Sequence, residues 1–345
     1  SWTMRGSDPV PQPANASVRQ LDIWMSPHGF LKAAAAADDV TALNLVLEGR
    51  QLTMLSFTAM DRYRLNGTIN ELHQVERVQT WIGNPIFGDM IYDHRYTEYQ
   101  EFGGWMFPTV LHSHQGDPRI HPGHTSMEIR VTDVQPNVAA SALSVPSNVR
   151  EALIPDVIVR STEMAEGIWR ISGGTHHSVA MEFSDFVAVV EAPQDEARSL
   201  AVIAEVRRVI PEKPIRYVVN THHHADHAGG LRTYVAQSAT VITHEVNRDF
   251  YTDVLFHPGT RSMRPDILSD HMPWFAPNRI PALELVGDSY TLTDGERTMD
   301  IHPILRSGHA GSMLIVHLPQ ERILINADLY SPPAPDADPP AVNVN

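Results

Sequence analysis

Residues Thr221 to Gly230 read T-H-H-H-A-D-H-A-G-G and place four metal-binding side chains within six positions, namely His222, His224, Asp226 and His227. The stretch directly follows the apolar run Ile215-Arg216-Tyr217-Val218-Val219, which is typical of a buried strand. Imidazole and carboxylate groups are ordinary zinc ligands. The pattern therefore predicts a metal-binding loop at the end of a buried strand, and this loop is the candidate active site.

The spacing of the donors has a physical reason. In an extended segment alternate side chains point to the same side, so His222 and His224 can share one cation while His223 points elsewhere. Asp226 and His227 follow past the turn, where they can face a second cation a short distance away. A solvated histidine-rich loop accounts well for an isolated H-x-H pair, but poorly for the full H-x-H-x-D-H followed by Gly-Gly.

The motif T-H-H-H-A-D-H resembles the H-x-H-x-D-H signature of the metallo-beta-lactamase superfamily, most closely its glyoxalase II-type and lactonase-type branches. The resemblance extends from about Met164 to the C-terminus. It implies an α/β fold, an αββα sandwich that holds its metals in a cleft at one edge of two sheets. It is specific for fold and metal and says little about substrate.

The resemblance also implies ligands late in the chain. Ser307-Gly308-His309-Ala310-Gly311 matches the third motif of the superfamily, so His309 is expected to complete the first metal site with His222 and His224. Asp328 ends an apolar strand and is expected to bridge both metals. A turn histidine and a strand-end capping aspartate are the alternatives.

The ligand pattern breaks near the C-terminus. The superfamily has a further histidine after the bridging aspartate, whereas no histidine follows His317 here. We expect either that the chain is truncated, or that the second metal is held by Asp226, His227 and Asp328 with waters or a substitute ligand. A mononuclear or easily stripped second site follows, because losing even outer-shell partners costs a metal site about 10- to 100-fold in affinity.

Two further segments are candidates for the substrate site. In the resemblance, the loop between the first strands lies over the cleft, so His176 or His177 is expected there, and we assign substrate binding to His177. A hydrogen-bonded turn histidine is an equal alternative. Residues 250–281 are long, irregular and aromatic, which predicts a lid or wall over the cleft, with core packing as the alternative.

The first part of the chain has a different pattern. Residues 1–20 are rich in Pro, Ser and Asn and are predicted to be a flexible N-terminus. Residues 21–145 are predicted to form a smaller, mainly antiparallel β domain, and residues 146–345 the metal-binding domain. Strands are expected in the following segments: 51–57, 63–69, 74–82, 94–99 and 127–131.

Two histidine pairs in this β domain, His112 with His114 and His121 with His124, have ligand-like spacing but no acidic partner in sequence, so they are interpreted as surface or strand-edge residues. The stretch Phe102-Gly103-Gly104-Trp105-Met106-Phe107-Pro108 weakly resembles the hairpins of bacterial lipoprotein carriers. That resemblance suggests an exported bacterial protein, periplasmic or secreted, with a cytoplasmic location as the alternative.

Composition limits the partners. The 345 residues are 42% hydrophobic and 19% charged, with a net charge of −15, so a nucleic-acid partner has no electrostatic support. The absence of cysteine leaves only His and carboxylate side chains as strong metal ligands. No apolar run is long enough for a membrane span. A small-molecule substrate is expected, and a homo-oligomer is possible.

The sequence thus predicts a metallo-hydrolase, with one or two zinc ions that generate hydroxide from water to attack an ester, lactone or lactam. Asp226 is expected both to bind metal and to orient the nucleophile. Iron and manganese also suit the ligands. The alternatives are a phosphodiesterase or sulfatase, which should show more Arg or Lys near the cleft, and a non-catalytic carrier with a degraded metal site.

Overall fold

The computed structural model describes residues 1–116, 124–139, 144–256, 261–271, 282–304 and 306–330. The chain divides into two units: unit 1 comprises Ser1–Asp156 with Ser262–Arg264, and unit 2 comprises Val157–Arg261 with Pro265–Asn345. The domain boundaries expected from sequence stay a prediction. No helix in the described part of the chain has the length and apolar character needed to cross a membrane.

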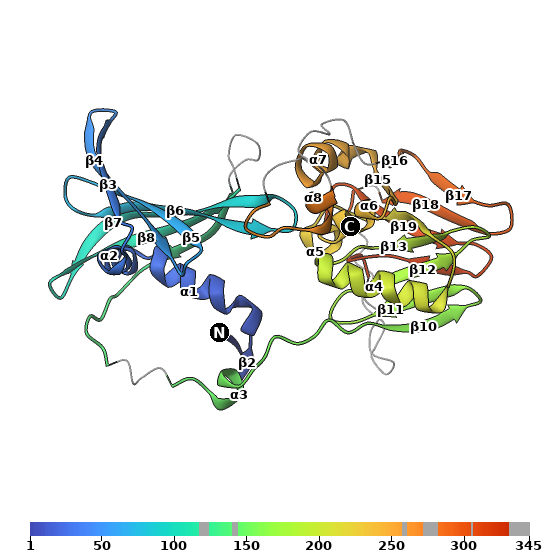
Figure 1. Ribbon diagram of the computed structural model, residues 1–345, viewed down its shortest axis with the longest axis horizontal. Coiled ribbons are helices and arrows are strands. Elements are labelled where there is room, and N and C mark those ends of the chain that lie inside the picture. Colours follow the sequence, from blue (N-terminus) through green and yellow to red (C-terminus); the bar gives the residue numbers. More distant parts are fainter. Residues whose placement is uncertain (117–123, 140–143, 257–260, 272–281, 305, 331–345) are drawn as a thin grey trace. The chain divides into compact units, whose positions relative to one another are not determined.

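Unit 1 is built on a seven-stranded antiparallel sheet whose strands follow chain order (Figure 1). Its strands are β3 (Thr41–Leu47), β4 (Arg50–Ala59), β5 (Tyr63–Ile69), β6 (Val75–Asn84), β7 (Gly88–Phe102), β8 (Trp105–Gln115) and β9 (His124–Arg130). The remaining elements are the hairpin β1 (Trp2–Arg5) and β2 (Asp8–Pro11), the 3-10 turn η1 (Pro13–Asn15), and helices α1 (Ala16–Met25), α2 (Pro27–Ala36) and α3 (Ser147–Arg150). The hairpin lies in the segment predicted to be flexible, and that flexibility stays a prediction.

Helices α1 and α2 pack on this sheet because each has an apolar stripe. Leu21 and Met25 of α1 and Phe30 of α2 are fully buried against the sheet residues Phe57 and Leu65. The five strands expected from the alternating pattern correspond to β4, β5, β6, β7 and β9. Strand β3 was not predicted, and β8 falls in the stretch that resembles a hairpin.

Unit 2 contains two sheets. The seven-stranded sheet has the order β10 (Arg160–Ala165), β11 (Ile168–Ser172), β12 (Ser178–Glu182), β13 (Val187–Val190), β14 (Ile215–Val219), β15 (Thr240–His244) and β16 (Leu283–Val286). Strands β10 to β13 are antiparallel, and β13 to β16 are parallel. The antiparallel second sheet consists of β17 (Tyr290–Thr293), β18 (Thr298–Ile304), β19 (Met313–Leu318) and β20 (Ile323–Ile325).

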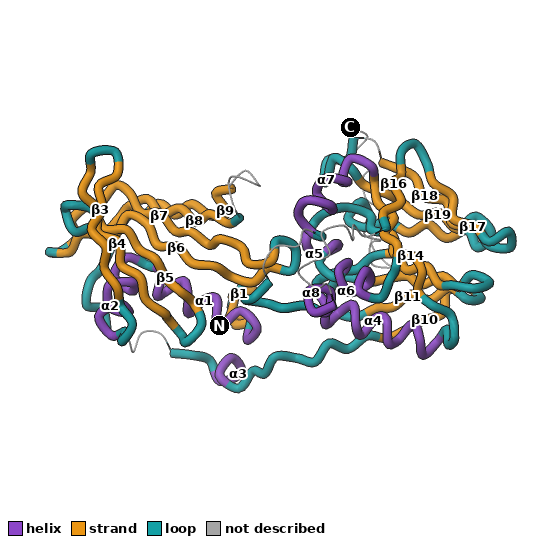
Figure 2. Tube along the Cα trace, turned by 45° about the horizontal axis from the view of Figure 1, so that its top comes forward, coloured by secondary structure: helices purple, strands orange, loops and turns teal. Residues whose placement is uncertain are grey.

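The two sheets of unit 2 share one apolar core. Met181, Val190 and Val219 of the first sheet lie in the same buried cluster as Ile301 and Leu314 of the second. The two sheets therefore pack face to face as a sandwich. Figure 2 shows the strands of unit 2 in two layers.

Helices of unit 2 connect the parallel strands. They are α4 (Glu196–Val209), α5 (Ala225–Ala228), α6 (Leu231–Ala236), η3 (Glu245–Asn247), α7 (Arg248–Phe250), the π-helical turn η4 (Tyr251–Leu255) and α8 (Ile267–His271). Helices α4 and α6 pack together and against the seven-stranded sheet. The predicted α/β class, with an antiparallel β region before the sandwich, is confirmed. Because β13 and β14 are parallel, their carboxyl ends meet at one edge of the sheet, and the candidate site lies there.

Candidate metal centre

The loop after β14 carries the predicted motif. Strand β14 ends at Val219, and the next three residues, Asn220, Thr221 and His222, are fully buried. The backbone N–H of Asn220 donates to Ile242 of β15 at 3.0 Å, and the carbonyl of Thr221 accepts from Leu314 of β19 at 2.8 Å. The start of the loop is therefore fixed to both sheets.

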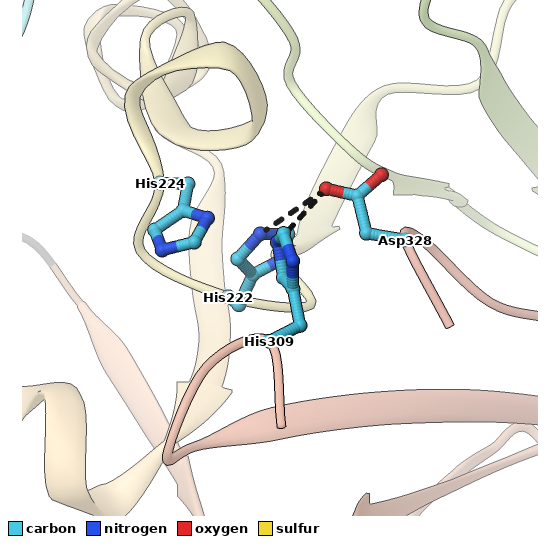
Figure 3. A group of neighbouring side chains, drawn as sticks. All are labelled: His222, His224, His309 and Asp328. Carbon is cyan, nitrogen blue, oxygen red and sulfur yellow. Dashed lines mark ion pairs between the residues drawn. The ribbon is translucent and has the colours of Figure 1, made fainter. Parts of the chain in front are cut away.

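The first donor group consists of His222, His224, His309 and Asp328, whose ligand atoms all lie within 4.8 Å of one another. Figure 3 shows the Asp328 carboxylate directed at the imidazoles of His222 and His309, with His224 beside them. His309 comes from the turn between β18 and β19, and Asp328 follows β20. All four are residues that the sequence predicts as ligands, and their role as metal ligands stays a prediction.

The second donor group consists of His176, Asp226 and His227, with ligand atoms again within 4.8 Å of one another. Asp226 and His227 lie on the short helix α5, directly after the cap residue His224. His176 comes from the β11–β12 loop, and its Nε2 lies 3.2 Å from Asp226 Oδ2. Two of the three residues were predicted as ligands; His176 was not.

Asp328 joins the two groups. One oxygen, Oδ2, lies 3.1 Å from His309 Nε2 in the first group and 2.9 Å from His227 Nε2 in the second. Its backbone has a φ of +60°, a left-handed conformation that aspartate tolerates better than most residues. The Asp328 carboxylate therefore lies between the two donor groups.

Two buried imidazoles have nitrogen atoms whose hydrogen-bonding capacity the protein does not use, as expected of groups that bind a metal. The Nε2 atoms of His222 and His227 are buried and make no well-aligned hydrogen bond, and the polar atom they face is the carboxylate of Asp328. Burial, followed by the neighbouring His227 and His224, lowers the pKa of His222 to about 3, so this ring is neutral and its lone pair can bind metal.

The donor spacing also fits a cation. Two donors about 2.0–2.1 Å from a tetrahedral zinc lie about 3.4 Å apart. The distances from Asp328 Oδ2 to His309 Nε2 and His222 Nε2, 3.1 and 3.7 Å, lie on either side of that value. The first group, three imidazoles and one carboxylate, is therefore a suitable set for zinc.

Glu191 supports the second group and was not predicted from sequence. It directly follows β13 and is 5% exposed. Its Oε2 accepts from His227 Nδ1, and its Oε1 accepts from the backbone N–H of Thr221 at 2.8 Å. This carboxylate fixes the tautomer of His227 so that Nε2 faces the donor groups. The only signal in sequence is an acidic residue that ends an apolar run.

The pKa of His227 has opposing causes. Burial alone lowers the pKa, but the hydrogen bond from its Nδ1 to Glu191 and the charges of Glu191, Asp328 and Asp226 raise it above the ordinary value. For Asp226, burial raises the pKa, and its backbone hydrogen bond together with His227 and His176 lowers it below the ordinary value. The carboxylates around His227 therefore favour positive charge at this position.

Two further histidines near the loop, His223 and His177, belong to neither donor group among the described residues. The ring of His223 contacts the rings of His224 and Phe250, with centroid distances of 5.2 and 5.4 Å. His177 is exposed and belongs to neither donor group. Its predicted role in substrate binding stays a prediction.

Some aromatic residues of the segment predicted as a lid are buried in the core of unit 2. Tyr251 and Phe256 are buried, so these two side chains follow the core-packing alternative, while Phe250 is half-buried beside His223. Trp274 and Phe275 lie outside the described residues.

The two histidine pairs of unit 1 are not in the donor groups found among the described side chains. His112 and His114 lie on β8, and His112 Nε2 is 3.0 Å from a carboxylate oxygen of Glu128. His121 lies outside the described residues, and the side chain of His124 is not described.

Comparison with known proteins identifies the domain. Residues 173–340 match the family model described as the metallo-beta-lactamase superfamily. Residues 173–340 therefore form a metallo-beta-lactamase superfamily domain, which supports a metallo-hydrolase. No curated protein sequence matches the chain.

Several solved structures are similar in fold. A metallo-beta-lactamase from Pontibacter korlensis is 18% identical, with 50% of this chain and 75% of that chain covered and a TM-score of 0.39. FIM-1 from Pseudomonas aeruginosa, a metallo-beta-lactamase solved in a mono-zinc form, is 20% identical over 48% of this chain and 67% of that chain, with a TM-score of 0.33. The metallo-beta-lactamase DIM-1 is 17% identical over 48% and 67%, with a TM-score of 0.36.

Proposed function

We propose that the chain is a zinc-dependent hydrolase that cleaves an ester, lactone or lactam at a two-cation centre. The observation that carries this proposal is the position of Asp328 Oδ2, which lies close to His309 of the first donor group and His227 of the second. Two cations held on either side of this carboxylate would acidify a water molecule and polarise a substrate carbonyl.

The protein groups have separate roles in this proposal. His222, His224, His309 and Asp328 hold the first cation, and Asp226, His227 and Asp328 hold the second. Asp226 is half-exposed, with its side chain 54% accessible, so one face of its carboxylate is open to the solvent from which water and substrate arrive. Because its pKa is lowered, it is ionised at neutral pH and can accept a hydrogen bond from the attacking water and orient it.

A neutral acyl substrate fits the charges better than a phosphodiester or sulfate ester. Arg232, the basic residue closest in sequence to the motif, is 5% exposed and donates from Nε and Nη2 to the two carboxylate oxygens of Asp266, at 2.6 and 3.0 Å. It also donates to the carbonyl of Leu255. A guanidinium paired in this way holds the protein together and is not directed at an anionic substrate.

The test combines metal content and turnover. Protein purified without added metal is analysed for zinc, iron and manganese, and its hydrolysis of lactones, β-lactams, simple esters and bis-p-nitrophenyl phosphate is compared. We expect at least one zinc per chain as purified, two after zinc is added, and turnover of an acyl substrate that stops when a chelator removes the metal. Metal without any turnover would favour the carrier alternative, and preference for the phosphodiester would overturn the substrate class.

Location and assembly complete this proposal. An exported, periplasmic protein agrees with the weak carrier-like resemblance in unit 1, and a homo-oligomer stays a prediction. Light scattering on the purified chain measures the oligomeric state, and fractionation of expressing bacterial cells checks the compartment.

A further inference from the structure

His176 is the one member of the two donor groups that does not come from the H-x-H-x-D-H stretch or from the late turns. It lies in the loop between β11 and β12, about fifty residues before Asp226. Its Nε2 is 3.2 Å from Asp226 Oδ2, and its ring centroid is 4.9 Å from that of His227. The imidazole is therefore on the same side of α5 as the two predicted ligands of the second cation.

The position of His176 is fixed by buried contacts. Arg198 of α4 is 2% exposed, and its guanidinium donates to the backbone carbonyl of His176 at 3.0 Å. Gly173 makes room for this guanidinium, because a Cβ there would lie 2.2 Å from Arg198 Nη1 and 2.4 Å from the carbonyl oxygen of Ile158. The buried guanidinium of Arg198 thus fixes the backbone of the loop at His176 and leaves the imidazole free to face α5.

The ring orientation of His176 is also set. Its Nδ1 lies 2.7 Å from Thr175 Oγ1, which leaves Nε2 directed at Asp226. The side chain is 22% exposed, compared with 54% for Asp226. A partly buried imidazole with one nitrogen engaged by the protein and the other facing a carboxylate is arranged as metal-binding histidines are.

We propose that His176 is a ligand of the second cation, which it would bind through Nε2 together with Asp226, His227 and the shared oxygen of Asp328. This gives the second cation two imidazoles and two carboxylates, a donor set that suits zinc. The proposal rests on the proposed function, because it assumes that the second donor group holds a cation. It gives the β11–β12 loop a direct part in the metal centre.

The experiment measures metal binding and does not depend on knowing the substrate. The full chain, stripped with a chelator, is titrated with Zn²⁺ in competition with a chromophoric chelator, and with Co²⁺ to follow visible absorption. His176→Ala is compared with His177→Ala, a matched control because the two histidines are neighbours and His177 belongs to neither donor group. We expect two equivalents in the wild-type chain and in His177→Ala, with the second equivalent weakened by about 100-fold or more in His176→Ala.

A second variant separates binding from positioning. His176→Gln keeps an N–H that can donate to Asp226 but removes the imidazole lone pair. If His176 is a ligand, the second equivalent is weak in both the Ala and the Gln variants, and the Co²⁺ spectrum of that equivalent changes. If Gln restores the affinity lost in Ala, His176 only orients Asp226, and the proposal is overturned.

The remaining outcomes distinguish this proposal from the proposed function. Two unchanged equivalents in His176→Ala would overturn the role of His176 and leave the two-cation hydrolase standing. Fewer than two equivalents in the wild-type chain would overturn both. Circular dichroism and thermal unfolding of the stripped variants check that each is folded, because a loss of metal binding counts only in a folded chain.

Discussion

The two donor groups lie on either side of Asp328 but differ in how they are built. In the first group His222 is fully buried, and the residue before it, Thr221, is hydrogen-bonded to β19. In the second group Asp226 is more than half-exposed, and His176 belongs to a loop held by the side chain of Arg198. The start of the motif is thus fixed by the sheets, whereas His176 and Asp226 come from a loop and a helical turn. This difference predicts that the second cation exchanges more readily than the first.

The largest expected effect comes from removing the charge that both groups share. Asp328→Asn preserves size and, because asparagine tolerates a positive φ, also the backbone at φ +60°. We expect loss of both metal equivalents and a fall in turnover of about 1,000-fold or more, as for the loss of other transition-state electrostatic groups. Elemental analysis and kinetics measure the two effects, and Asp288→Asn, at an exposed position of the same unit, is the control. Retention of two equivalents would contradict a shared carboxylate.

His309→Ala should act mainly on the first group. It removes one of three imidazoles there, so the tighter equivalent should weaken by about 100-fold or more while the second is changed less. His302→Ala on β18 is the matched control, because that histidine is exposed and lies outside both groups. The same competition titration with Zn²⁺ measures both variants. Weakening of only the looser equivalent would reverse the assignment of the two groups.

Glu191→Gln should act on the second group alone. The amide can still accept from Thr221 through its oxygen, but it no longer stabilises His227 with a negative charge. We expect the second equivalent to weaken by about 10- to 100-fold and the first by much less. Titrating the variant with Zn²⁺ at constant pH tests this, and equal weakening of both equivalents would show that Glu191 holds the whole loop in place.

The smallest effect on the site should come from a carboxylate on α4. Hydrogen bonds from Arg208 and from Ser161 lower the pKa of Glu205 to about 2. A lowered pKa contributes stability that is present above the unfolded value of 4.5 and is lost as pH falls from there towards 2. Glu205→Gln should therefore flatten the dependence of thermal stability on pH in that window. Both metal equivalents at pH 7 should be unchanged, and a lost equivalent would mean that α4 affects the site beyond Arg198.

The sequence predicts the fold class because the metal motif follows a strand and is specific for its superfamily. The four donors of the motif lie within six positions, and His309 and Asp328 follow from the same resemblance. The structure places all six in two neighbouring donor groups. Their roles as ligands, and that of Asp226 in catalysis, stay predictions.

Residues that reach the site from distant elements were not predictable in the same way. Glu191 follows β13, and it meets His227 only because β13 and β14 are parallel neighbours. His176 and His177 are adjacent in sequence, and no local pattern says which of the two faces Asp226. The choice depends on the contact between Arg198 and the His176 carbonyl, which exists only in the folded unit.

The hydrogen bond between Thr221 and Leu314 has a consequence for the order of folding. It joins residues that are about ninety positions apart, and Asp328 is about a hundred positions from His222. Contacts of such long range form late, because the intervening chain must first lose its freedom. A chain whose second sheet has not yet docked offers a cation His222 and His224 but neither His309 nor Asp328. Tight metal uptake should therefore coincide with the last stage of folding, and the bound cation would stabilise the fully folded domain.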